Sequence, residues 1–480
     1  MTLLLAFIPI AAALAGFFIR SSPVRARLLP IVATIHLGLL LVCLARGDQP
    51  MAGAWFALDA LGGWFLLVIS SLFNLCAWYA PAYLASRPEQ HGNHRILVLC
   101  MLAFLGLASL MVQAQHPAVV WVVMEATAMT AAPMIYFDRH QRSLEATWKY
   151  LMIGSVGIAL ALLGTMFVAY AAHQAQHGSS LLFNDLIANA QALPPTWLRA
   201  GFVLLLVGYG TKMGLAPLHA WKPDAYGESP GMIGALMAGG VTSCAFLALL
   251  RLYAVITAAG QAPMAREMFL ALGFLSMAWA GVFLVRQKDI KRLLAYSSVE
   301  HMGILAVGIG LGGAAIRFAL FHLAANTLVK GVLFLSAGNI HRAFASKHLP
   351  FASGAIARAP VSGWLFLLGF LAITGSPPFA PFVSEFGLTM AAFNSGQTWA
   401  GILFLVLLGC IFLGMSATVL QVVHGVPDPD MPRTRYEDTP ATTVPLIVAL
   451  LLALVLGLWL PAPLDRLLTK AAAGIEGAAP

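Results

Sequence analysis

Residues 210–219 read Gly210-Thr211-Lys212-Met213-Gly214-Leu215-Ala216-Pro217-Leu218-His219, and they follow a run, 201–207, that is apolar throughout. An ammonium group near the middle of a membrane helix costs at least about 2.5–3.5 kcal/mol on insertion scales, so it normally faces a cavity or an ionic partner. The glycines and the proline beside Lys212 predict a helix that breaks within the membrane, which is tolerated only where the backbone is buried or lines water. We interpret a charge at such a break as part of an ion path.

The composition excludes a soluble protein. Of the 480 residues, 60% are hydrophobic and 10% are charged, and the mean hydropathy is +0.85. No soluble domain of this size has such a composition. A helix needs about 20 apolar residues to cross a hydrocarbon core of about 30 Å. The chain has about fourteen such runs, near 2–19, 28–45, 60–82, 95–114, 118–137, 146–171, 199–219, 231–255, 267–286, 293–312, 315–340, 361–391, 400–424 and 442–461.

These runs predict an all-α integral membrane protein with about fourteen transmembrane helices. The run near 361–391 is too long for one straight crossing and contains Pro377, Pro378 and Pro381, so we expect it to break as well. The seventh and the twelfth helix are therefore the two broken helices. The longer polar segments lie outside these runs, and one of them has room for a short interfacial helix near 181–192.

The two predicted breaks indicate an internal duplication. Leu215-Ala216-Pro217 and Phe379-Ala380-Pro381 each follow a glycine-containing apolar run, and Lys212 and Glu385 lie close to the two prolines. Paired broken helices in corresponding halves are typical of membrane proteins built from inverted repeats. We expect N-terminal helices in 1–94, five-helix repeats in 95–255 and 256–425, and a loop, a fourteenth helix and a short tail in 426–480.

The loop charges predict the orientation. Arg20, Arg25 and Arg27 follow the first apolar run instead of preceding it, which favours an uncleaved first helix over a secretory signal. Most other loop cations, among them Lys222, fall in the odd-numbered loops, so the net charge of +8 reflects loop asymmetry and not nucleic-acid binding. The positive-inside rule then places those loops in the cytoplasm and the N-terminus outside. The even-numbered loops hold only Arg46, Arg199, Arg251, Arg266 and Arg317.

Glu125 and Lys149 are ionisable groups in neighbouring apolar runs. Glu125 lies near the middle of its run, where a carboxylate needs a compensating cation, and either Lys212 or Lys149 would form a pair that can switch its protonation. A structural ion pair or a contact with a lipid headgroup is the alternative. Lys149 begins its run one turn after Glu145, so a lysine that reaches out to the interface is the alternative there.

A row of polar residues follows one face of the run near 315–340. His322, Asn326 and Lys330 are spaced i, i+4 and i+8, which keeps them within about 80° on a helix and spreads them over about 12 Å. Histidine titrates near neutral pH and passes protons with the help of water. A single buried histidine satisfied within the core is the alternative, and three polar groups in register weaken it. Glu385 would close the row at the second break.

The residues around Glu300 and His301 allow two interpretations. They follow a cluster of loop charges, so they form either a network at the cytoplasmic edge or a part of the proton path. The ionisable groups as a whole are spread over the fifth to the twelfth helix, whereas a substrate pocket would gather them. We interpret them as a lateral hydrophilic axis at mid-membrane, and we identify no catalytic residue.

The cysteines predict no metal or cluster site. All five lie within apolar runs, without the spacing of a metal or iron–sulfur motif, so we expect buried structural cysteines, no metal ligands and no cofactor in this chain. They are Cys43, Cys76, Cys100, Cys244 and Cys410.

Three motifs carry a resemblance to a known family. They are Lys212-Met-Gly-Leu-Ala-Pro-Leu-His-Ala-Trp-Lys-Pro-Asp-Ala225, Lys291-Arg-Leu-Leu-Ala-Tyr-Ser-Ser-Val-Glu-His-Met-Gly303 and Pro377-Pro-Phe-Ala-Pro-Phe-Val-Ser-Glu385. Over roughly residues 95–425 the chain resembles the antiporter-like proton-translocating subunits of complex I, Mrp antiporters and group 4 hydrogenases, and within them it is most similar to the F component of hydrogenase-4.

The resemblance implies fourteen helices, two inverted five-helix repeats and broken helices seven and twelve. It implies proton-transfer roles for Glu125, Lys149, Lys212, His322, Lys330 and Glu385. The chain departs from the family at Ser243, where many relatives have lysine or histidine, and at Asn326 and Tyr226, where histidine is frequent, so its central relay would depend more on water or hydroxyl groups. The accessory positions are His219, Asp224, Ser243, Glu300, His301 and Asn326.

We therefore expect a multi-pass subunit of the bacterial cytoplasmic (inner) membrane that conducts protons, with Na⁺ as the alternative ion. Its partners would be membrane subunits of the same family and redox subunits with nickel–iron or iron–sulfur centres. A cation/proton antiporter or ion-coupled uptake subunit without a redox partner is the second hypothesis. A docking subunit that no longer transports is the third.

Overall fold

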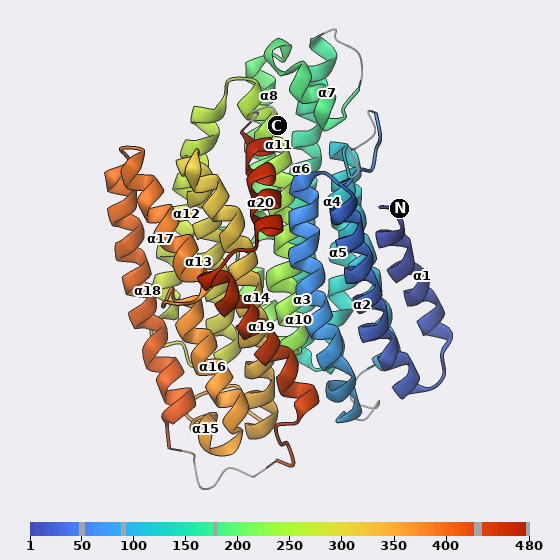
Figure 1. The fold of residues 1–480 in the computed structure, drawn as a ribbon, viewed down its shortest axis with the longest axis vertical. Helices are drawn as coiled ribbons and strands as arrows, with labels where there is room; N and C mark the ends of the chain where they lie inside the picture. The colour runs from blue at the N-terminus through green and yellow to red at the C-terminus, as the bar shows by residue number, and fades with distance from the viewer. Residues whose placement is uncertain (48–52, 88–92, 176–179, 427–433, 477–480) are drawn as a thin grey trace.

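The computed structural model describes residues 1–47, 53–87, 93–175, 180–426 and 434–476. Figure 1 shows helices that run roughly along the long axis, with α1 and α2 at one side, α18 at the other and α14 between them. The end that carries α15, Arg87, Arg292 and Lys347 is called the lower end here. The end that carries α7, Asp59 and Arg251 is called the upper end.

The first half of the chain supplies the elements α1 to α11. The membrane segments are α1 (Leu4–Phe18), α2 (Ser22–Arg46), α3 (Ala60–Ala85), α4 (His94–Gln113), α5 (Pro117–Ile135), α6 (Gln141–Gln174), α8 (Pro195–Met213), α9 (Trp221–Glu228), α10 (Gly231–Leu236), the π-helical turn η4 (Met237–Val241) and α11 (Thr242–Ala258). Short helices outside these are η2 (Tyr136–Asp138), α7 (Phe183–Ala188) and η3 (Ala190–Ala192), and the last two lie where an interfacial helix was expected.

The second half supplies α12 to α20. These are α12 (Ala262–Leu284), α13 (Ile290–Leu311), α14 (Ala314–Phe344), α15 (Ala355–Arg358), α16 (Pro360–Ile373), α17 (Ala380–Asn394), α18 (Thr398–His424), α19 (Pro440–Leu458) and α20 (Ala462–Ile475). The sequence predicts only a short tail after the fourteenth helix, but α20 packs there against α3 and α14.

The helix count agrees with the sequence. In the described ranges, eleven helical segments are long and apolar enough to cross a membrane. The short apolar helix α1 and the two interrupted pairs α8/α9 and α16/α17 bring the number of crossings to fourteen. The predicted all-α membrane fold with broken helices seven and twelve is confirmed.

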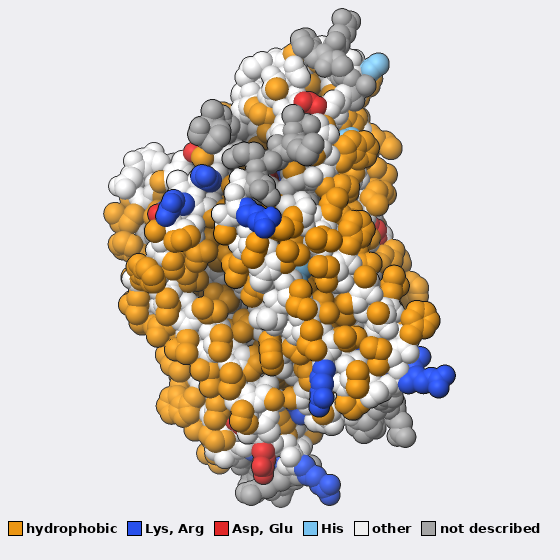
Figure 2. Space-filling model, turned by 45° about the vertical axis from the view of Figure 1, so that its right-hand side comes forward, with side chains coloured by type: hydrophobic (Ala, Val, Ile, Leu, Met, Phe, Trp, Pro, Cys, Tyr) orange, Lys and Arg blue, Asp and Glu red, His pale blue; other side chains and the backbone are white. Residues whose placement is uncertain are grey.

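The surface is that of a membrane protein. Figure 2 shows hydrophobic side chains over most of the visible face, while the lysine and arginine side chains lie toward its two ends. Phe18, Leu413 and Leu458 are among the large apolar side chains that are exposed. Cys410 is also exposed on α18, so the prediction that every cysteine is buried is wrong at this position, because this helix turns one face away from the bundle.

Both breaks begin at a glycine with a left-handed backbone. Helix α8 ends where Gly214 takes φ +80°, and Gly375 takes φ +70° two residues after the end of α16. L-residues with a side chain rarely adopt this conformation, so glycine ends the helix without strain. The first break is held in place by Ser276 of α12, whose Oγ accepts a hydrogen bond from the Ala216 N–H at 2.8 Å.

The eighth membrane crossing, formed by α10, η4 and α11, is irregular in another way. Its middle is the π-helical turn η4, which is buried throughout, and Thr242 and Ser243 follow directly. The Ser243 hydroxyl donates to the Gly239 carbonyl at 2.7 Å within the same helix. A π-helical turn widens the backbone locally and is frequent at functional sites.

An ion pair between a buried arginine and a partly exposed aspartate closes the upper end of the bundle. Arg251 is buried on α11 and donates from both terminal nitrogens to Asp59, at 2.8 and 3.1 Å. It also donates to the Gln115 side chain and to the Val112 carbonyl. The sequence places Arg251 in an even-numbered loop, whereas in the structure it lies on α11 and joins this helix to the start of α3 and the end of α4.

We predict that Asp59→Asn destabilises the protein. Asparagine keeps the N-cap of α3, where Asp59 Oδ1 accepts the Gly62 N–H. The exchange removes the charge that faces Arg251. Breaking a fully buried pair costs about 3–5 kcal/mol, and the loss is smaller here because the Asp59 side chain is 31% exposed. The midpoint of thermal unfolding of the purified chain in mild detergent should fall.

The matched control is Asp465→Asn. It breaks the ion pair of Asp465 with Arg317, whose side chains are 44% and 37% exposed, and an exposed pair is worth about 0–1 kcal/mol. The interpretation of Arg251 is wrong if Asp59→Asn lowers the midpoint no more than this control does.

Candidate functional site

The first group of the site is an ion pair at the end of α8. Lys212 is 1% exposed, and its Nζ lies 3.4 Å from Oε2 of Glu125, a residue of α5. The lysine also lies over the Tyr150 ring of α6, 5.3 Å from the centroid. A Cβ atom at Gly154 of α6 would lie only 2.6 Å from Lys212 Nζ. The absence of a side chain at Gly154 therefore gives the lysine its place between α5, α6 and α8.

Lys222 is a second buried lysine, on the other side of the break. It is in the first turn of α9, is fully buried, and its Nζ has no hydrogen-bond partner among the described residues. Its stem lies against Gly214, where a Cβ would meet Lys222 Cε at 2.1 Å. The charges of Lys222 and Lys330 are close enough to repel each other. The charge pattern of the sequence places Lys222 in a loop. Its position shortly after Gly214 and Pro217, inside the broken helix, is the signal that could have identified it as a buried residue.

Lys330 and Glu300 form the centre of the site. Both are buried, on α14 and α13, and they attract each other electrostatically. Lys330 Nζ lies 3.4 Å from the Leu294 carbonyl, and the Ser297 hydroxyl donates to Glu300 Oε2 at 3.3 Å. The packing of α13 against α12 and α14 encloses Glu300 and His301, so both side chains lie inside the bundle.

Two histidines connect α13 to α14. His301 Nδ1 and His322 Nε2 are 2.9 Å apart, and the rings are stacked. His322 Nδ1 is in turn 2.8 Å from the Ser384 hydroxyl at the start of α17. Glu385 follows and is nearly buried, and its Oε2 lies against Gly375, where a Cβ would come within 2.2 Å.

These groups follow one another from the first break to the second and are together called the polar axis here. The structure brings together five of the six residues assigned to proton transfer and adds Lys222, Glu300 and His301 between them. Most neighbouring members come from different helices, whereas Glu300 and His301 are adjacent on α13. The polar axis consists of Glu125, Lys212, Lys222, Lys330, Glu300, His301, His322 and Glu385.

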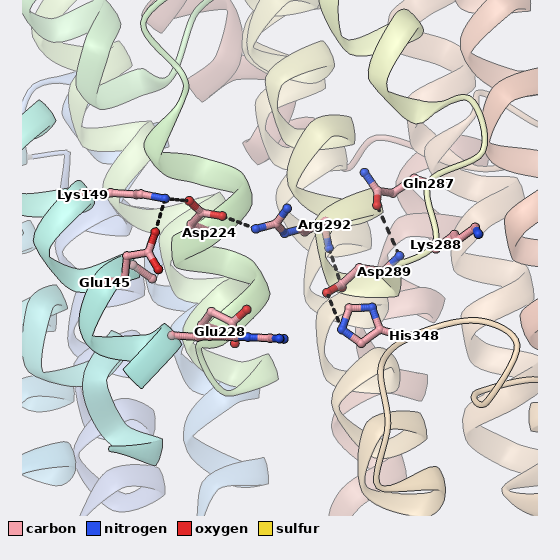
Figure 3. Close-up of a pocket in the computed structure, with 11 residues that line it drawn as sticks. Glu145, Lys149, Asp224, Glu228, Gln287, Lys288, Asp289, Arg292 and His348 are labelled. Carbon is pink, nitrogen blue, oxygen red and sulfur yellow. Dashed lines mark hydrogen bonds and ion pairs between the residues drawn. The ribbon is translucent and has the colours of Figure 1, made fainter. Parts of the chain in front are cut away.

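Lys149 lies apart from the polar axis. Its side chain is 43% exposed and pairs with Glu145 at 2.6 Å and with Asp224 at 2.8 Å. Figure 3 shows Lys149 and Arg292 pointing toward Asp224 from opposite sides of a pocket at the lower end. Asp224 thus ties α6 to α13 through α9. Of the two lysines considered as partners of Glu125, only Lys212 is near it.

The remaining accessory residues are buried but less connected. His219 lies in the first break, with its ring edge-on to Trp279 of α12, and Asn326 lies on the same face of α14 as His322 and Lys330. The His219 Nδ1 and the Asn326 Oδ1 have no hydrogen-bond partner in the described part of the chain. Ser243 is occupied by its bond to the Gly239 carbonyl.

The arrangement is suited to moving small cations, above all protons. It contains both acids and bases, it is enclosed by apolar helices, and it holds buried polar atoms without partners that water can satisfy. Three pockets of the described residues lie at the two ends of the bundle, away from this arrangement.

Comparisons with known proteins agree with this geometry. The family described as "NADH:quinone oxidoreductase/Mrp antiporter, TM" matches residues 114–411. The Hydrogenase-4 component F homolog of Methylacidiphilum infernorum is 32% identical over 438 residues, which are 88% of each chain. The N subunit of the NADH-quinone oxidoreductase of Desulforudis audaxviator is 30% identical over 434 residues, 86% of this chain and 83% of the relative.

Solved structures share the fold. A chain of the membrane-bound sulfane sulfur reductase, an archaeal respiratory membrane complex, superposes with a TM-score of 0.88 at 22% identity and covers 99% of this chain and 97% of that one. A chain of the Mrp complex of Dietzia sp. DQ12-45-1b gives a TM-score of 0.85 at 20% identity, with the same coverage. With its broken helices, its buried ion pair at the first break and this extent of similarity, the chain belongs to the antiporter-like membrane subunits of the NADH:quinone oxidoreductase/Mrp antiporter family.

Proposed function

We propose that this chain conducts protons, with Na⁺ as the alternative ion, as a membrane subunit of a larger respiratory redox complex. The observation that carries the proposal is the polar axis, which links Glu125 at one side of the bundle to Glu385 through both broken helices. Buried charges are costly in a membrane, so a row of eight ionisable groups needs a function that uses them. We also propose that the two five-helix repeats occupy 95–255 and 256–425.

The pair of Glu125 and Lys212 is the proposed switch. While the two side chains are in contact, the carboxylate stabilises the ammonium group. When Glu125 turns away, the ammonium group loses its partner in a low dielectric, and the release of a proton toward the break becomes favourable. Lys222, which lies over Gly214, is placed to take up that proton.

Lys222 is the proposed replacement for the lysine or histidine that this chain lacks in its eighth membrane crossing, at Ser243 of α11. The relay implied by the family resemblance has a lysine or histidine at the position of Ser243, and here the serine hydroxyl is bonded within its own helix. Lys222 supplies an ammonium group next to Lys330 from a different element. From Lys330 the proton passes Glu300 and the two histidines toward Glu385.

The pocket at the lower end is the proposed connection to one side of the membrane. It is lined by residues of α6, α9 and α13, with Lys149 and Asp224 at its wall, and it contains several carboxylates and cations that exchange protons with solvent. We propose that this end faces the cytoplasm of a bacterial cell and that the N-terminus lies outside, as the positive-inside rule predicts.

Redox chemistry would take place in partner subunits. The relatives include a hydrogenase-4 component and membrane subunits of NADH-quinone oxidoreductases. We propose that partner subunits with nickel–iron or iron–sulfur centres, together with further membrane subunits of this family, form the complex, and that this chain itself holds no redox cofactor.

A secondary cation/proton antiporter is the second candidate. It is favoured by the similarity to a Na(+)/H(+) antiporter subunit of Alkalihalophilus pseudofirmus, 29% identical over 348 residues. That relative is longer, and the match covers 41% of it.

Lys212→Met tests the proposed function. Methionine keeps the apolar stem but has no proton to transfer, so proton uptake by vesicles that carry the assembled complex should fall at least about tenfold. Lys470→Met on α20 is the control, because Lys470 is exposed and lies outside the polar axis. Undiminished proton uptake in the Lys212 variant refutes the function, and it would favour a docking subunit.

Lys222→Leu tests the additional lysine. We expect it to reduce proton uptake about as strongly as the Lys212 variant, because leucine interrupts the axis between the break and Lys330. Lys222→His should retain a part of the activity, since imidazole also carries a proton. Equal activity of the leucine and histidine variants, both assembled and active, would show that Lys222 only fills space.

Purification of the native complex in mild detergent separates the two candidates. We expect redox subunits with metal centres to copurify with this chain, and the absorption and metal content of the preparation would reveal them. Copurification with antiporter subunits alone would instead support the second candidate.

A further inference from the structure

Three side chains from three helices converge where α13, α14 and α17 meet. His301, His322 and Glu385 each offer a ligand atom, and these atoms all lie within 4.8 Å of one another. All three side chains are buried. Two histidines and one glutamate form a set that binds Zn²⁺ in proteins, whereas Mg²⁺ and Ca²⁺ prefer oxygen ligands. The sequence predicted no metal site, because the ligands lie 21 and 63 residues apart along the chain.

The hydrogen bonds around Ser384 fix the tautomers of the histidines. The Ser384 hydroxyl donates to the Pro381 carbonyl at 2.8 Å, so it accepts from His322 Nδ1–H. His322 Nε2 then carries a lone pair, and His301 Nδ1 donates its hydrogen to it at 2.9 Å. This leaves His301 Nε2 as an acceptor, and it has no hydrogen-bond partner among the described residues.

Two buried polar atoms of the cluster are therefore unsatisfied. They are His301 Nε2 and Glu385 Oε1, and a buried polar atom without a partner costs about 1–3 kcal/mol. The nearest carboxylate to His301 Nε2 is that of Glu300, whose Oε2 lies 3.8 Å away, beyond hydrogen-bond range. The cluster is poised for a ligand that changes the tautomer of His301 and engages Glu385.

We propose that His301, His322 and Glu385 bind a divalent transition-metal ion, with Zn²⁺ as the preferred ion. The metal would replace the hydrogen between His301 Nδ1 and His322 Nε2, and Glu385 Oε1 would be the third ligand. Zinc–nitrogen bonds of about 2.0–2.1 Å in a tetrahedral site hold two nitrogens about 3.3 Å apart. The two rings then have to separate by about 0.4 Å from their present contact, and Glu385 has to close in.

Binding satisfies the unpaired atoms. The displaced hydrogen of His301 moves to Nε2, from which it donates to Glu300 once the 3.8 Å gap to Oε2 has closed, and Glu385 Oε1 gains the metal. The Ser384 hydroxyl continues to hold His322 in the tautomer that leaves Nε2 free. Histidine ligands of zinc usually donate their second nitrogen to a carboxylate or to another acceptor in this way. A water molecule would complete the tetrahedron.

Zinc binding is independent of the proposed transport, because the cluster can bind a metal in a chain that conducts nothing. One consequence rests on the proposed function. A metal between the two imidazoles occupies the place of the proton that they share, so it would stop the relay between Glu300 and Glu385.

Metal content tests the site. The purified complex is equilibrated with Zn²⁺, freed of loosely bound ion by gel filtration, and analysed for zinc per chain. We expect the unsubstituted chain to retain one zinc ion more than the His301→Gln/His322→Gln double variant. His348→Gln is the matched control, since this exposed histidine of the lower end pairs with Asp289 and should leave the difference unchanged. Equal zinc content in the unsubstituted and the double-variant complex overturns the proposal.

A second test uses a variant that gains an absorption band, because a misfolded variant would not show it. His301→Cys keeps a metal ligand, and with Co²⁺ as the probe it should show the intense near-ultraviolet absorption of a cobalt–thiolate bond, which the unsubstituted chain lacks. The band should vanish when His322→Gln and Glu385→Gln are added. Absence of the band in His301→Cys, or its persistence in the triple variant, also overturns the proposal.

Discussion

The structure depends on the cost of holding a charge in a medium of low dielectric. A lysine or a carboxylate among apolar helices needs an opposite charge, a dipole or water close by, and each must be placed by the backbone. Lys212 meets this need through Glu125 and the Tyr150 ring. The helix α8 breaks directly after Lys212, and beyond the break a second lysine, Lys222, packs back against Gly214.

Glycines connect the broken helices to the charges. Gly214 and Gly375 end their helices with left-handed backbones, and each also leaves the space that a charged side chain fills. Lys222 lies against the first and Glu385 against the second. The same residue type therefore interrupts the helix and admits the ionisable group, which explains why break and charge occur together in both halves of the chain.

The two halves of the chain use different ionisable groups in the polar axis. The first half uses two lysines, Lys212 and Lys222, and the carboxylate of Glu125, which pairs with Lys212. The second half uses Lys330, Glu300 and a pair of histidines whose hydrogen bonds run in one direction from His301 to Ser384. The two stacked imidazoles share one hydrogen between His301 Nδ1 and His322 Nε2. The same two nitrogens can pass a proton or, without that hydrogen, bind a metal ion.

The sequence alone determined which segments cross the membrane, where two of them break and that several charges, such as Lys212 and Lys330, lie within them. These properties are local, since an entire run must be apolar to enter lipid, and glycine and proline act on their own backbone. It also indicated that His322, Asn326 and Lys330 share a face, because helical periodicity fixes that. Only the tertiary structure decided which charges meet. It buried Lys222, which the charge pattern places among the loop residues, drew Glu300 and His301 into the interior and left Lys149 at the lower end. Such partnerships depend on how helices far apart in sequence pack against one another, and no pattern within one helix specifies its neighbour.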